Sequence, residues 1–94
     1  MTVMVIAELT PVPGQGEGLR RAVQTLTVAS RAEEGCLSYR PLLDPARPGT
    51  IVILETWRDA EAVVSHGKTE AMAQFKAAIK GAEVVVTRHR ISAA

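Results

Sequence analysis

Residues 51–57, IVILETW, decide the fold. The first four residues are apolar at successive positions, a pattern typical of a strand that is buried on both faces. Because side chains alternate along a strand, Glu55 and Trp57 share one face with Ile51 and Ile53. A carboxyl group and an indole ring are therefore expected to point into an apolar layer.

A turn and an earlier strand are predicted before this segment. Residues 44–49, DPARPG, are rich in turn formers, and Cys36 to Asp44 alternate loosely in polarity. Two strands joined by a hairpin fit this pattern. Pro41 lacks a backbone N–H, so the earlier strand is expected at a sheet edge or with a bulge, and its register near Pro41 stays open.

Two more strands are predicted near the ends of the chain. Thr2 to Thr10 are β-branched and apolar, and the sequence PVPG at residues 11–14 ends the pattern. Glu83 to Ile91 form the last strand, which is centred on three consecutive valines.

Apolar residues recur at helical spacing in the remaining stretches. The first helix follows Gly18 and ends near Glu34-Gly35, with Gly35 expected as a left-handed cap. Its apolar stripe consists of Leu19, Ala22, Val23, Leu26 and Ala29 or Ser30. Asp59 is expected to cap a second helix that Gly67 breaks. A third helical stretch starts near Thr69 and ends before Gly81, with a stripe of Met72, Phe75 and Ile79.

The order β-α-β-β-α-β predicts an α+β, ferredoxin-like protomer with a four-stranded antiparallel sheet. Both helical regions then cover one face of the sheet and leave the other face bare. Since three strands read as buried on both faces, a second copy of the chain is expected to cover the bare face, forming a homodimer.

Length and composition limit the function classes. The 94 residues are expected to form a single domain, 1–94. The net charge of +1 gives no electrostatic case for nucleic acid or an anionic membrane. Cys36 is the single cysteine and no apolar run approaches the ~20 residues of a membrane span, so a cytoplasmic location is the default expectation.

His66, Tyr39, Trp57 and Glu55 are the candidate functional residues. His66 lies near a helix end in an apolar segment, where a neutral imidazole can act as a base, or where a half-exposed histidine simply caps the helix. Tyr39 can place a hydroxyl in the same region. Ordinary core packing is the alternative for Trp57, and a buried ion pair with an arginine is the alternative for Glu55.

Other motifs carry no chemistry. The glycine-rich residues 14–18, GQGEG, lack the spacing and the Lys-Ser/Thr ending of a phosphate loop. His66 and His89 are too far apart in sequence for a metal motif. Cys36 is interpreted as a small buried residue, because nothing near it in sequence favours a thiolate.

As a set, several short motifs resemble the antibiotic biosynthesis monooxygenase (ABM) family. They are Glu34-Gly35-Cys36-x-x-Tyr39, Asp44-x-x-x-Pro48, Glu55-x-Trp57, and His66 with Phe75 nine residues later. The resemblance covers nearly the whole chain and implies a ferredoxin-like protomer that forms a dimeric α/β barrel.

The resemblance implies several possible activities, because members include cofactor-independent monooxygenases, haem-degrading enzymes and an isomerase. The haem-degrading members have an axial histidine in a Phe-Lys-Ala-Ala-His context, where this chain has Ile79. They also have an asparagine near the end of the first strand, where this chain has Leu9. The resemblance therefore argues against haem degradation.

The expected function is cofactor-independent monooxygenation, with molecular oxygen, of a small aromatic, quinol or polyketide-like substrate. His66 is expected to act as base or proton shuttle and Tyr39 or Trp57 as hydrogen-bond donor, in a pocket between helices and sheet. The expected pocket residues are Glu55, Phe75, Met72 and Leu26, with no cofactor and no metal. The alternatives are a non-oxidative small-molecule-binding protein or isomerase on the same dimeric scaffold, and a purely structural dimeric module.

Overall fold

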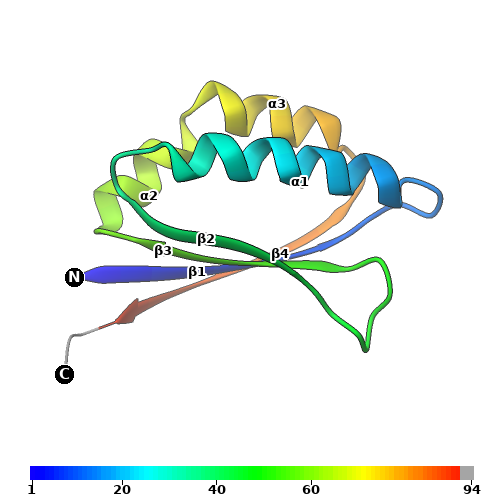
Figure 1. Cartoon of the computed structure of the whole chain (residues 1–94), viewed down its shortest axis with the longest axis horizontal. Helices are drawn as coiled ribbons and strands as arrows, with labels where there is room; N and C mark the ends of the chain where they lie inside the picture. The colour runs from blue at the N-terminus through cyan, green and yellow to red at the C-terminus, as the bar shows by residue number, and fades with distance from the viewer. Residues whose placement is uncertain (92–94) are drawn as a thin grey trace.

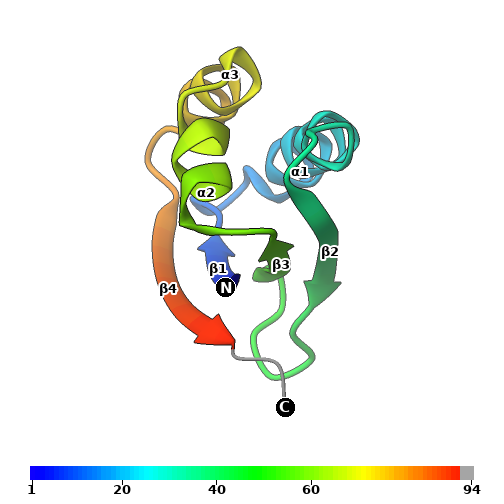
Figure 2. The same ribbon diagram turned by 90° about the vertical axis from the view of Figure 1, so that its left-hand side faces the viewer.

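Four strands form one antiparallel sheet with three helices on one of its faces (Figures 1 and 2). The computed structural model describes residues 1–91. The elements are β1 (Thr2–Thr10), α1 (Gly16–Arg31), β2 (Cys36–Leu43), β3 (Ile51–Trp57), α2 (Ala60–Gly67), α3 (Glu70–Ala78) and β4 (Glu83–Ile91). The spatial order of the strands is β2-β3-β1-β4. The predicted ferredoxin-like α+β fold is confirmed, with the second helical region divided into α2 and α3.

The two central strands, β1 and β3, are buried on the face that the helices cover. Along both strands, buried residues alternate with half-buried ones. Ile51, Ile53, Glu55 and Trp57 are all buried, so the shared face predicted for these four side chains is confirmed. A carboxyl group thus lies in the apolar layer between sheet and helices.

β2 forms one edge of the sheet, as Pro41 requires. The register between β2 and β3 shifts between Cys36 and Ser38, which marks a bulge. Pro41 itself pairs in regular register with Ile53, so the irregularity lies at the beginning of the strand and not at the proline.

The predicted left-handed cap at Gly35 is wrong. α1 ends at Arg31, and the right-handed residue Ala32 caps it by donating its backbone N–H to the carbonyls of Ala29 and Ser30. Gly35 does not have a positive φ. It is instead required by a close approach, because a Cβ atom at Gly35 would lie 2.4 Å from the Cβ of Ala62 in α2.

The beginnings of α2 and α3 are held by side-chain caps. Asp59 Oδ1 accepts a hydrogen bond from the backbone N–H of Ala62 at 2.8 Å, which confirms the predicted cap. Thr69 caps α3 by accepting from the N–H of Met72 at 3.2 Å. Gly81, with φ of +92°, turns the chain from α3 toward β4.

β4 is exposed along its whole length, on both faces, in the single chain. A bare outer face was expected for this strand, but its helix-facing valines, Val84 and Val86, are also 47% and 50% exposed. β4 pairs only with β1 and forms the second edge of the sheet. The helices therefore cover the sheet incompletely on this side.

The sheet face opposite the helices, called the open face, carries a group of apolar side chains. Its apolar members are Met4, Ile6, Leu42, Val52, Leu54, Val85 and Ile91, all half-buried or exposed. Several polar side chains on this face are paired with one another: Ser38 bonds Thr56, and Glu8 pairs with Arg47 of the β2–β3 turn. No helix within residues 1–91 is long and apolar enough to cross a membrane.

Replacing Gly35 with alanine is expected to destabilise the fold. The new methyl group would overlap the Cβ of Ala62, and relieving such a contact in a packed interior costs about 1–3 kcal/mol. Gly18→Ala is the matched control: its nearest neighbour would be Gln15 at 3.8 Å, and alanine in a helix gains up to about 1 kcal/mol over glycine. Urea unfolding at one fixed protein concentration measures both changes. Equal unfolding midpoints for Gly35→Ala and the wild type would contradict the close-packing interpretation.

Candidate active site

A cavity of about 280 Å³ lies between the helices and the sheet, in the region where β4 is uncovered. Its floor includes Val5 and Ala7 of β1 and Val84 and Val86 of β4. The side chains of both edge valines line it and remain exposed, so the cavity is open to solvent along β4. Six of the predicted site residues line this main cavity: Leu26, Tyr39, Glu55, His66, Met72 and Phe75.

One row of residues crosses the sheet beneath this cavity. Tyr39 pairs with Glu55, Glu55 with Val5, and Val5 with Arg88. All four side chains line the main cavity and therefore point toward the helices. This transverse row joins one edge of the sheet to the other and places the carboxyl of Glu55 next to an apolar position.

His66 is the best-placed acid–base group at the cavity. It is 6% exposed, whereas the alternative interpretation from the sequence was a half-exposed histidine that caps the helix. That alternative is wrong. Its Nδ1 lies 2.7 Å from Glu33 Oε2, in the turn after α1. A carboxylate can only accept, so the neutral ring carries its proton on Nδ1. Nε2 is then the ring nitrogen that is able to accept a proton from a molecule in the cavity.

Aromatic rings surround the imidazole. The Trp57 ring lies against His66 with a centroid separation of 4.5 Å and an interplanar angle of 35°. The Tyr39 ring meets the same imidazole edge-on at 6.1 Å. The imidazole is therefore packed between an indole and a phenol ring.

Trp57 does not line the main cavity. Its indole N–H donates to Glu55 Oε1 at 3.0 Å, and the side chain is 1% exposed. The indole N–H, which the sequence suggested as a donor to a substrate, is therefore already bonded to Glu55. The arginine ion pair considered for Glu55 does not form among residues 1–91, where its hydrogen bond comes from this indole.

Burial shifts the pKa values of two groups at the cavity, the carboxyl of Glu55 and the hydroxyl of Tyr39. Burial raises the pKa of Glu55, and the Trp57 hydrogen bond and the charge of His66 partly oppose that rise. Burial, aided by the charge of Glu55, also raises the pKa of Tyr39 well above its ordinary value. Tyr39 therefore remains a neutral hydroxyl, and the side chain of Ser30 in α1 partly opposes the rise.

Sequence reasoning missed Glu33, Lys76 and Arg88. Glu33 follows the end of α1, where a negative charge is unfavourable beside the helix carbonyls, and that unfavourable position was an available signal. Lys76 of α3 and Arg88 of β4 also line the main cavity. The signal for Arg88 was the alternation along β4, because Val84, Val86 and Arg88 share one face of the strand.

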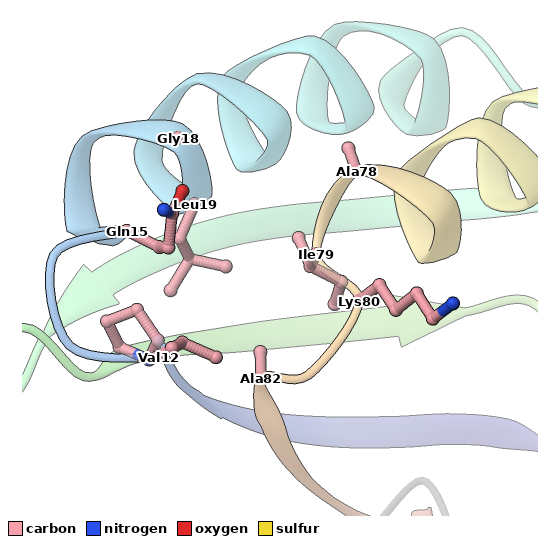
Figure 3. Close-up of a pocket in the computed structure, with 9 residues that line it drawn as sticks. Val12, Gln15, Gly18, Leu19, Ala78, Ile79, Lys80 and Ala82 are labelled. Atoms are coloured by element: carbon pink, nitrogen blue, oxygen red, sulfur yellow. The ribbon is translucent and has the colours of Figure 1, made fainter.

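Other parts of the described chain offer weaker sites. A smaller cavity of about 80 Å³ lies between the start of α1 and the end of α3, and the lysine side chain at its border extends away from the other lining residues (Figure 3). Within residues 1–91, no group of three His, Cys, Asp or Glu side chains is arranged to hold a metal ion. Burial raises the pKa of the Cys36 thiol, and His89 is exposed beside Thr87.

Comparisons with known proteins agree with this fold. The model of the antibiotic biosynthesis monooxygenase family matches residues 2–78. The chain is 33% identical over 89 residues to the Escherichia coli protein "Probable quinol monooxygenase YgiN", across 82% of this chain and 84% of YgiN. The structure of Rv0793 from Mycobacterium tuberculosis superposes with a TM-score of 0.91 at 26% identity, across 100% and 98% of the two chains. PA3566 from Pseudomonas aeruginosa superposes with a TM-score of 0.87 at 32% identity, across 98% and 95%.

Replacing Glu55 with glutamine is expected to change how stability depends on pH. Because the folded chain raises the pKa of Glu55, it binds this proton more tightly than the unfolded chain does. The free energy of unfolding therefore contains a favourable contribution below the ordinary pKa, which is lost as pH rises through the raised pKa. The glutamine side chain of the variant keeps an oxygen that accepts from Trp57, and it does not titrate.

Urea unfolding of the wild type and Glu55→Gln between about pH 4 and pH 8 tests this expectation. The stability of the variant relative to the wild type should increase with pH across that window. Taking the difference removes the opposite contributions of Asp44 and Asp59, whose pKa values hydrogen bonds lower. A difference that is constant with pH would contradict the assignment.

Proposed function

The chain belongs to the antibiotic biosynthesis monooxygenase family, and on that premise we propose that it is a cofactor-independent monooxygenase of a small aromatic, quinol or polyketide-like substrate. The observation that carries the proposal is the Glu33–His66 pair, 2.7 Å apart, at the wall of an open cavity. A substrate that forms a stabilised anion can itself reduce oxygen. The protein then needs only an apolar pocket, a base and a donor for the anion.

His66 is proposed as the base. Nε2 accepts the proton of a substrate hydroxyl or activated C–H group, and Glu33 stabilises the imidazolium through Nδ1. The Trp57 ring packs against the same imidazole. Trp57 and Glu33 are positioning residues in this proposal, because they act on the imidazole and not on the substrate.

Tyr39 is proposed as the donor to the substrate anion. A phenol is protonated at neutral pH, and burial raises the pKa of Tyr39 further. Tyr39 and His66 line the same cavity and their rings are in contact, so donor and base can serve one bound molecule.

The reaction balances without a further reductant. The substrate gains one oxygen atom and loses two hydrogen atoms, and the second oxygen atom of O2 leaves as water. The electrons come from the substrate anion, and the imidazolium returns its proton to the departing oxygen. His66 thus ends the cycle in the neutral form in which it began.

A homodimer is proposed for the active protein. The open face carries seven apolar side chains, and a large exposed apolar patch on a sheet marks a surface that another layer covers. Glu8, a charged member of this face, is already paired with Arg47. A second copy of the same face, related by two-fold symmetry, would supply the missing layer.

His66→Ala is expected to lower oxygen uptake by about 10²- to 10⁴-fold with a dihydroxynaphthalene or anthrone, because the variant loses its general base. Glu33→Gln should lower it by a smaller factor, since the amide still accepts from Nδ1 but carries no charge to stabilise the imidazolium. The matched control is Glu34→Gln, the neighbouring carboxylate, whose side chain is 93% exposed.

Oxygen consumption above the uncatalysed background measures all three variants. An unchanged rate in His66→Ala would remove the base assignment. If the wild-type protein bound the aromatic tightly but consumed no oxygen, the non-oxidative binding protein or isomerase would replace the monooxygenase proposal.

Leu54→Arg is expected to produce monomers. Leu54 lies near the centre of the open face, and two buried arginines facing each other across the symmetry axis would oppose association. Val28→Arg is the control, because Val28 is a 73% exposed apolar residue on α1. Sedimentation velocity at micromolar concentration should give twice the chain mass for the wild type and Val28→Arg. A compact, stable wild-type monomer would contradict the dimer.

A further inference from the structure

The main cavity has a cationic side that the proposed chemistry does not use. Lys76 of α3 and Arg88 of β4 both line it. Neither of them forms one of the ion pairs made within residues 1–91. Two positive charges from different elements therefore border one cavity, and the charge of Arg88 also acts on Glu55, which lines the same cavity.

The transverse row sets the distance between this cationic side and the acid–base side. Glu55 and Arg88 are separated by one strand, at Val5. With strands about 4.8 Å apart, the backbones of Glu55 and Arg88 lie about 10 Å apart. Val5 lies between them, and the neighbouring row of the cavity floor, with Ala7 and Val86, is also apolar.

Across the sheet, the row beneath the cavity therefore runs from a polar end through an apolar position to a cationic end. Tyr39 and Glu55 stand on the first side, and Arg88 stands at the other, on the open β4 edge. A flat aromatic molecule with a hydroxyl at one end and an anionic group at the other matches this order. The cavity volume of about 280 Å³ is close to the lower limit of ligand pockets, about 300 Å³, which favours a small fused-ring molecule.

We propose that the substrate is an aromatic hydroxy-carboxylate, whose carboxylate binds Arg88 and Lys76 while its hydroxyl faces His66. This inference rests on the proposed function and names its substrate class. A guanidinium group binds a carboxylate through two parallel hydrogen bonds, and a ring carboxylate lies close to the plane of its ring, as a narrow cavity requires. Arg88 and Lys76 are exposed, so their charges are attractive to an anion without a large loss of hydration.

Binding under argon tests the inference separately from turnover. The probes are a naphthalenediol and the same diol with a ring carboxylate, titrated by calorimetry or by the fluorescence of Trp57, the single tryptophan. Wild-type protein should bind the carboxylate about tenfold to a hundredfold more tightly than the neutral diol, as expected for charge-assisted hydrogen bonds. The preference, expressed as the ratio of the dissociation constants of the neutral diol and the carboxylate, should fall as salt is raised, because the cations are exposed.

Arg88→Gln and Lys76→Gln should each reduce this ratio of dissociation constants toward one. Arg90→Gln is the matched control: Arg90 is an exposed arginine two residues along β4 and does not line the main cavity. Its ratio should equal that of the wild type. Because each ratio is measured within one variant, a general loss of folded protein does not mimic the effect.

Three results would overturn the inference: equal binding of the two probes by the wild type, an equal loss of preference in Arg90→Gln, or a preserved preference in both Arg88→Gln and Lys76→Gln. Failure of the proposed function has a different signature. In that case the wild type would show the carboxylate preference under argon and no oxygen uptake in air.

Discussion

The close approach of Gly35 to Ala62 is the contact on which the candidate active site depends. It brings the turn after α1 against α2, and a second tie follows directly, since the N–H of Arg58 donates to the carbonyl of Gly35 at 2.8 Å. Ala62 and His66 are one helical turn apart and share a face of α2. The turn after α1, which contacts Ala62, therefore also places Glu33 against His66. A side chain at position 35 would separate the two segments and with them the acid–base pair.

The shortage of aromatic residues has a structural consequence at the same place. Tyr39 and Trp57 both lie against the His66 ring, and Phe75 projects from α3 into the core. On β4 the residues that line the cavity toward the helices are valines, Val84 and Val86, which stay exposed by about half. Tyr39 and Trp57 thus pack around the imidazole, and the small side chains of β4 leave part of the layer as a cavity. An apolar layer filled with leucine and phenylalanine would close that space.

Much of this arrangement follows from local sequence pattern, and the remainder does not. The alternation in residues 51–57 placed Glu55 and Trp57, Asp59 predicted the start of α2, and Pro41 predicted an edge strand. The roles of Gly35 and Glu33 were not predicted, because their partners lie far along the chain, 33 residues away in the case of Glu33 and His66. Periodicity reports which face a residue occupies and not which residue meets it there. The same reason applies to β4: its valines read as buried, and in the folded chain the helices leave them exposed.

The charges along the transverse row couple its two ends. Burial raises the pKa of Glu55, whereas the positive charge of Arg88 is among the influences that lower it. A carboxylate bound to Arg88 would neutralise that influence, and the pKa of Glu55 would then rise further. Glu55 lines the same cavity as His66, and its hydrogen bond comes from the indole that lies against the imidazole. An anion bound at Arg88, at one edge of the sheet, would therefore act on the carboxyl group nearest to the other side of the cavity, although the two sites share no direct contact.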